Sequence, residues 1–116
     1  MADGPSIAIA CDLTALSPAE REQRQLLAER VWSGALDVRE LTDGYAVRVP
    51  ADADSYRQVA ELLLLERRCC PFFRLGIELE ENHGPIWVRL TGGPGVKEFL
   101  AQTGIAQLAP SPKACC

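Results

Sequence analysis

The sequence predicts an α+β fold: a two-layer sandwich in which helices cover a largely antiparallel sheet of about five strands. Two observations support this class. Short stretches alternate apolar and polar residues, as half-buried strands do. Between them lie stretches with helical spacing and capping residues, which gives the order β-α-β-β-α-β-β-α. The 116 residues suffice for one domain with a single core.

The first strand is expected over residues 7–13, where every second residue is apolar. A helix should follow, ending near Trp32. Ser17 and Glu20 have the spacing of a capping box, and a proline stands between them at the first helical position. Gly34 is expected to end this helix.

Residues 36–41 and 45–49 are predicted to pair as a hairpin. The turn between them contains Asp43 and Gly44, a pair that supplies the positive φ that tight turns need. Apolar side chains at alternate positions of the second strand should face the core.

The second helix is predicted to begin near Asp54 or Ser55 and to reach Arg68. Pro71 disfavours helical geometry in the residue before it. The adjacent cysteines Cys69 and Cys70 should therefore lie at the end of this helix.

Two further strands are expected over residues 73–79 and 86–90, followed by a short helix over 96–102. We expect residues 1–104 to form a single compact domain. Residues 105–116, which include two prolines, are expected to form a flexible tail.

Composition and charge exclude several classes of protein. Twelve Lys and Arg against sixteen Asp and Glu give a net charge of −4, which argues against nucleic-acid binding. The longest apolar runs, residues 7–11 and 62–65, are too short to span a membrane. No secretory signal is recognised at the N-terminus, so a cytoplasmic location is expected. The glycines of 92–97 lack the Gly-Lys-Ser/Thr end of a phosphate loop, and the single histidine, His83, is expected to be solvated in a turn.

The five cysteines are the unusual feature of the composition. Cys69 and Cys70 place two soft donors side by side, and thiolates select Hg(II), Cu(I), Cd(II), Zn(II) and As(III) over hard ions. A structural disulfide is not expected in a cytoplasmic protein, although a vicinal disulfide between the two remains an alternative. Arg67 and Arg68 favour the thiolate, whereas the end of a helix disfavours it. One of the pair can also be a small buried apolar residue.

Cys11 is the candidate third ligand. It is predicted to end the first strand, and the helix that carries Cys69 and Cys70 should pack on the same sheet. A distance below about 10 Å between its sulfur and the pair would permit a three-thiolate site for Hg(II) or As(III). Considered alone, Cys11 is equally a core residue, and Asp12 is either a carboxylate ligand or a helix cap.

Cys115 and Cys116 end the chain and are candidates for a tethered carrier. A mobile dithiol could acquire a soft ion and pass it to a fixed site at a high effective concentration. The pair resembles the C-terminal vicinal cysteines of mercuric reductases, which deliver mercury to an internal thiol pair. The alternative is that this pair has no role.

Several segments together carry a wider resemblance: 10–13, 17–20, 65–74, 84–92 and 95–100. Their motifs, above all Glu-Arg-Arg-Cys-Cys-Pro-Phe, resemble those of a group of small, functionally uncharacterised bacterial proteins. The resemblance implies one compact domain, points to Cys11, Cys69 and Cys70, and implies a link to mercury or arsenic resistance.

Three hypotheses of function follow. The first is a cytoplasmic protein that binds a soft metal or metalloid ion, or a small thiol-reactive ligand. The second is a thiol enzyme, a reductase or organometal lyase, in which Cys69 or Cys70 attacks a soft centre. The third is a structural or homodimerisation module whose cysteines have no role. Four side chains are predicted to share one sheet face, which is either covered by helices or forms a partly open pocket or a dimer surface: Phe72, Arg74, Trp87 and Arg89.

Overall fold

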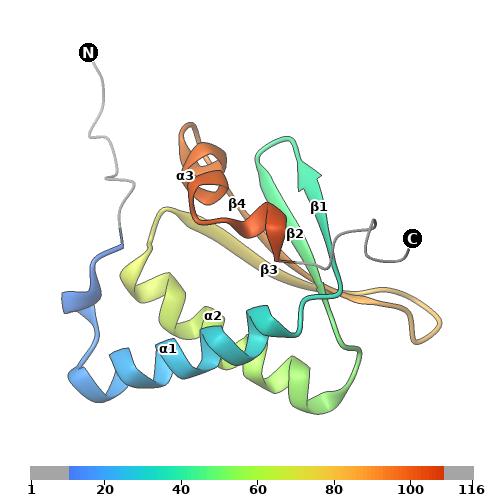
Figure 1. Ribbon diagram of the computed structural model, residues 1–116, viewed down its shortest axis with the longest axis horizontal. Helices are drawn as coiled ribbons and strands as arrows, with labels where there is room; N and C mark the ends of the chain where they lie inside the picture. Colours follow the sequence, from blue (N-terminus) through green and yellow to red (C-terminus); the bar gives the residue numbers. More distant parts are fainter. Residues whose placement is uncertain (1–10, 109–116) are drawn as a thin grey trace.

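The computed structural model describes residues 11–108. Its elements in chain order are a 3-10 turn (Leu13–Ala15), α1 (Pro18–Ser33), β1 (Asp37–Leu41), β2 (Gly44–Val49), α2 (Ala53–Cys69), β3 (Phe73–Leu79), β4 (Ile86–Gly92), α3 (Val96–Gln102) and a second 3-10 turn (Ile105–Gln107) (Figure 1). The α+β class is confirmed, with three α-helices and a four-stranded antiparallel sheet among the described residues.

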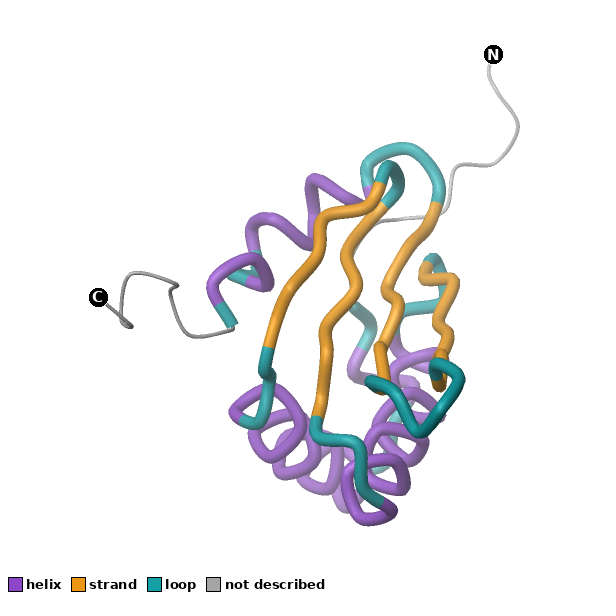
Figure 2. Tube along the Cα trace, turned by 90° about the vertical axis from the view of Figure 1, so that its right-hand side faces the viewer, coloured by secondary structure: helices purple, strands orange, loops and turns teal. Residues whose placement is uncertain are grey.

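The sheet has the order β1-β2-β4-β3, and every neighbouring pair is antiparallel (Figure 2). β2 and β4 are the central strands. Val47 of β2 lies opposite Val88 of β4, and both are fully buried. Leu90 of β4 lies opposite Leu75 of β3 on the same face. Alternation along the strands therefore directs one apolar face of the sheet towards the helices.

The strand predicted at residues 7–13 is not found in its described part, and residues 7–10 lie outside the described range. Asp12 instead caps the turn Leu13–Ala15, because its carboxylate accepts a hydrogen bond from the Thr14 N–H (3.0 Å). The Asp12 N–H donates to the Cys69 carbonyl (2.7 Å) and so joins the end of a helix instead of a strand. Within residues 11–108 the sheet accordingly has four strands, where about five were predicted.

α1 and α2 lie side by side and pack on the apolar face of the sheet (Figure 1). The capping box of Ser17 and Glu20 is present as predicted. The predicted start of α2 is wrong by one or two residues. Asp52 is its cap and accepts a hydrogen bond from the Ser55 N–H (2.7 Å), so the helix begins at Ala53.

Gly44 is needed in the first hairpin for a reason that the sequence did not indicate. The glycines with positive φ in the described range are Gly95 and Gly104, so Gly44 does not adopt the predicted conformation. A Cβ atom at Gly44 would lie 2.0 Å from the Leu90 carbonyl oxygen. The close approach of β2 to β4 therefore excludes a side chain there. His83, as predicted, is exposed in a turn.

α3 and the turn after it complete the helical layer. Val96, Leu100 and Ile105 are each 1–4% exposed and belong to the same core as α1 and α2. Leu108 also packs against this core. The compact domain thus extends past residue 104, because Ile105 is buried where a flexible tail was predicted. Residues 109–116 of that predicted tail lie outside the described residues.

The opposite face of the sheet carries Trp87, and Arg74 and Arg89 are exposed on the same face. Trp87 is only 4% exposed, since the guanidinium of Arg39 lies 4.3 Å above its ring. Phe72 does not share this face, contrary to the prediction. It packs edge-on against Phe99 of α3, with ring centroids 5.3 Å apart.

Candidate functional site

Several hydrogen bonds join the segment before α1, residues 11–17, and the first turn of α1 to the end of α2. In addition to the backbone bond from Asp12 to Cys69, Arg68 donates to the Ala15 carbonyl (3.1 Å) and to both carboxylate oxygens of Glu20 (2.7 and 3.2 Å). Leu16, which is 2% exposed, anchors the segment in the core. These contacts place Cys11 beside the pair of cysteines that ends α2.

The two adjacent cysteines differ in backbone conformation because the helix ends between them. Cys69 is the last residue of α2 and retains helical geometry. Cys70 has left it (φ −128°, ψ 68°), as expected for a residue before proline. Its N–H still donates to the Glu66 carbonyl (2.7 Å), which ends the helix.

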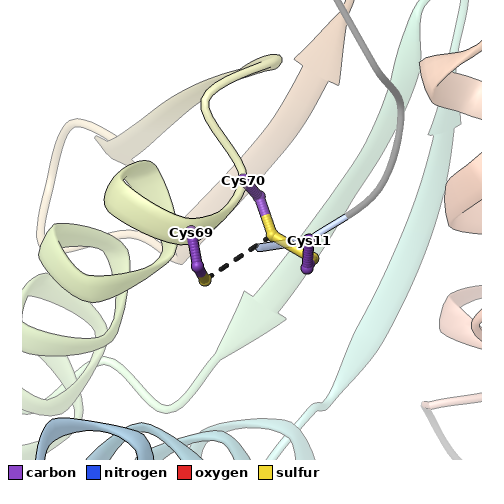
Figure 3. Close-up of side chains that lie close together, drawn as sticks. All are labelled: Cys11, Cys69 and Cys70. Atoms are coloured by element: carbon purple, nitrogen blue, oxygen red, sulfur yellow. Dashed lines mark hydrogen bonds between the residues drawn. A yellow bond between two sulfur atoms is a disulfide. The ribbon is translucent and has the colours of Figure 1, made fainter. Parts of the chain in front are cut away.

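Cys11 and Cys70 form a disulfide across a sequence separation of 59 residues, with Cα atoms 4.7 Å apart (Figure 3). The Cys69 thiol is free and fully buried, and its Sγ lies 3.7 Å from the Cys70 Sγ. All three sulfur atoms lie within 4.8 Å of one another. The predicted proximity of Cys11 is confirmed. The expectation that no structural disulfide forms is wrong, because the contacts at the end of α2 bring Cys11 to Cys70.

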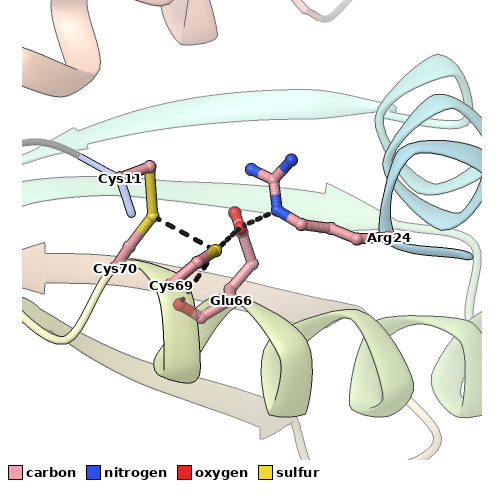
Figure 4. The surroundings of a disulfide bond; sticks show 5 residues. All are labelled: Cys11, Arg24, Glu66, Cys69 and Cys70. Atoms are coloured by element: carbon pink, nitrogen blue, oxygen red, sulfur yellow. Dashed lines mark hydrogen bonds and ion pairs between the residues drawn. A yellow bond between two sulfur atoms is a disulfide. The ribbon is translucent and has the colours of Figure 1, made fainter. Parts of the chain in front are cut away.

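A partly buried ion pair borders this sulfur cluster (Figure 4). Arg24 of α1 donates through Nε to Glu66 Oε1 (2.6 Å), and the Cys69 thiol lies 3.7 Å from the same oxygen. Burial, followed by the negative charge of Glu66, raises the pKa of the Cys69 thiol, while Arg24 opposes this shift. Cys69 is thus held as a neutral thiol in the resting protein.

Burial alone would lower the pKa of Arg24, but Glu66 and the Cys69 sulfur outweigh it and raise that pKa. Arg24 therefore stays charged beside the sulfur cluster. A fixed positive charge at this position offsets part of the negative charge that thiolates would bring.

Arg24 and Glu66 were not identified from the sequence as site residues. Glu66 is 7% exposed and lies between Leu62 and Cys69 on the buried face of α2. A carboxylate on the apolar face of a helix was the available signal, because a buried charge requires a partner. The partner could not be read from the sequence, since Arg24 lies on another helix.

A cavity of about 260 Å³ adjoins the cluster, between α1, the sheet and α3. Cys11, Arg24 and Glu66 form part of its wall. The remaining wall is mostly apolar and includes three aromatic side chains, Trp32, Phe73 and Phe99. Cys11 and a charge pair thus border a mostly apolar space.

Asp12, considered above as a ligand or a cap, is a cap. Cys115 and Cys116 lie outside the described residues. The cluster of Cys11, Cys69 and Cys70 is the only group of three or more His, Cys, Asp or Glu side chains within residues 11–108 that could hold a metal ion.

Within the same range, no helix combines the length and apolar character needed to cross a membrane. Comparisons of the chain with protein-family models, with curated proteins and with solved structures found no match.

Proposed function

We propose that this protein binds a soft metal or metalloid ion, Hg(II) or As(III), through the thiolates of Cys11, Cys69 and Cys70. The observation that carries the proposal is the convergence of three sulfur atoms from two distant segments within 4.8 Å. Thiolate sulfur is the donor that these ions prefer.

The sulfur spacing suits three-coordination. Metal–sulfur bonds of about 2.3 Å in a trigonal plane place the sulfur atoms about 4.0 Å apart. The Cys69 and Cys70 sulfur atoms are 3.7 Å apart, and none of the three pairs exceeds 4.8 Å. Small rotations of the side chains would therefore suffice once the disulfide is open.

The disulfide makes binding depend on redox state. Opening Cys11–Cys70 takes two electrons and two protons, which two molecules of a small thiol supply as they become one disulfide. The reduced protein then presents three thiols, and binding an ion releases their protons. The oxidised protein retains only the buried Cys69 thiol in this cluster.

Titration of the reduced and the oxidised protein with Hg(II) or As(III) tests the proposal. A background of Cys115→Ser with Cys116→Ser restricts the measurement to the cluster. At a free ion concentration a thousandfold above the dissociation constant, the reduced protein should gain about 4 kcal/mol in the free energy of unfolding. Adding Cys69→Ser and Cys70→Ser should abolish this gain, and an unchanged gain would contradict the site.

One observation favours a second candidate, a thiol enzyme or exchange protein. The Cys69 sulfur lies 3.7 Å from Cys70, within reach of the disulfide. Attack by the Cys69 thiolate on the Cys70 sulfur would form a Cys69–Cys70 bond and expel the Cys11 thiolate, with no net oxidation. Cys11 is the exposed member of the three, and its thiolate would next attack an external disulfide, bond to one half of it and release the other half as a thiol. Accumulation of a mixed disulfide on Cys11 that disappears in Cys69→Ser would support this candidate.

A further inference from the structure

The cavity beside the sulfur cluster is larger than an ion requires. A bare ion held by three thiolates would leave the space of about 260 Å³ unused. An apolar cavity of about 150 Å³ in a protein can already bind benzene, so a single aromatic ring fits in this one. Most of the residues around it are apolar: Ala28, Trp32, Phe73, Leu90, Phe99, Leu100, Ile105 and Leu108.

Resting on the proposed function, we propose that the preferred ligand is a trivalent arsenic compound with one aryl group. The arsenic would bind Cys11 and Cys70, and the aryl group would occupy the cavity. Cys11 forms part of the cavity wall and is already within bonding distance of Cys70. An arsenic atom with one organic group has two bonds left for sulfur, which matches this pair. An organomercury cation forms one strong bond to sulfur and would use only one of the two.

The covalent step balances without an oxidant or reductant. Phenylarsine oxide and two protein thiols give two arsenic–sulfur bonds and one molecule of water, and arsenic stays trivalent. The two thiols are those of reduced Cys11 and Cys70. Cys69 keeps its proton in this complex, whereas inorganic As(III) would engage all three thiols. Cys69 therefore distinguishes the two classes of ligand.

The first measurement compares phenylarsine oxide with methylarsonous acid on the reduced full-length protein that carries Cys115→Ser and Cys116→Ser. In both compounds the arsenic atom can form two bonds to thiolates, and the compounds differ in the organic group. The ratio of their dissociation constants, divided by the same ratio for dithiothreitol, isolates the contribution of the cavity. We expect phenyl to be favoured by about tenfold to a hundredfold, the effect of burying an aromatic side chain. A ratio equal to that of dithiothreitol would overturn the inference.

Two substitutions of the same type sharpen the test. Ala28→Phe fills the cavity and should remove most of the preference for phenyl, with binding of inorganic As(III) unchanged. Ala101→Phe places the same ring at an exposed position of α3 outside the cavity and should leave the preference intact. If Ala28→Phe does not fold, a fluorescence measurement takes its place. The phenyl compound should quench the emission of Trp32, measured in the variant Trp87→Phe, in which Trp32 is the only tryptophan. Absence of quenching, or a preference that survives in Ala28→Phe, would overturn the inference.

Cys69→Ser separates the two classes of ligand further. This variant should bind phenylarsine oxide as tightly as the parent protein but should lose at least tenfold in affinity for inorganic As(III). Equal losses for both ligands would overturn the assignment of Cys11 and Cys70 to the aryl compound. If the parent protein binds none of Hg(II), inorganic As(III) and the aryl compound, the proposed function itself fails. If both bind without a preference for phenyl, only the inference about the cavity fails.

Discussion

Reducing the Cys11–Cys70 disulfide should lower the free energy of unfolding by about 4 kcal/mol. The bond closes a loop over a sequence separation of 59 residues, which includes α1, β1, β2 and α2. In the chain-entropy account, opening a loop of this length restores about 14 cal/mol/K to the unfolded chain, or about 4 kcal/mol at 25 °C. Nearly all of this entropy is gained by the unfolded state, because contacts of Asp12, Leu16 and Arg68 still hold the segment before α1 in place in the folded protein.

Urea unfolding with and without a reductant measures this difference, again in the Cys115→Ser and Cys116→Ser background. With a urea dependence of about 2 kcal/mol per molar, the midpoint should fall by about 2 M on reduction. Cys69→Ser keeps the disulfide and should show the same fall. Cys11→Ser cannot form the Cys11–Cys70 disulfide, so the urea midpoint of this variant should be the same with and without the reductant.

Adding As(III) to the reduced protein should recover much of the loss, because an ion shared by Cys11 and the end of α2 closes the same loop. Cys11→Ser should recover less, since its remaining ligands are adjacent in sequence and close no loop. Identical midpoints for the oxidised and reduced parent protein would refute the reasoning about the disulfide. Equal recovery by As(III) in the parent and in Cys11→Ser would refute the bridging role of Cys11.

Three further predictions concern charge and the chain terminus. Arg68 is the main cause that lowers the pKa of Glu20 from 4.5 to about 2. The stability that the Glu20 carboxylate contributes is therefore complete above about pH 4.5 and is lost as the pH falls towards about 2. Urea unfolding across this pH window should show a loss of stability in the parent protein and a smaller loss in Glu20→Gln. Arg24→Leu leaves the buried Glu66 carboxylate without its partner and should cost about 2–4 kcal/mol in urea unfolding, whereas adding Glu66→Leu should restore most of it. If the terminal cysteines are a carrier, deleting residues 111–116 should leave the urea midpoint unchanged and slow stopped-flow transfer of Hg(II) from a glutathione complex; equal transfer rates would remove the carrier role.

Local signals in the sequence predicted most elements of this fold. The capping box of Ser17 and Glu20 requires only residues three apart, and the end of α2 follows from Pro71 acting on its neighbour. Apolar residues alternate with other residues over 73–79, which is the two-residue period of a strand. The same reasoning failed at residues 11–13, because alternation also occurs where the chain bonds to a helix end, as Asp12 does to Cys69.

The proximity of Cys11 to the other two cysteines was predictable only in outline, and its bonding partner was not. Which cysteine pairs with Cys11 depends on the turn at Cys70, which directs one sulfur towards the incoming segment and leaves Cys69 facing Glu66. Local sequence patterns were enough to predict the α+β class, the boundaries of the observed α-helices and strands to within a few residues, and the cysteines that form the cluster. The disulfide, the pairing of Arg24 with Glu66 and the cavity could not be predicted, because each joins segments that are far apart along the chain and carry no local signal of their contact.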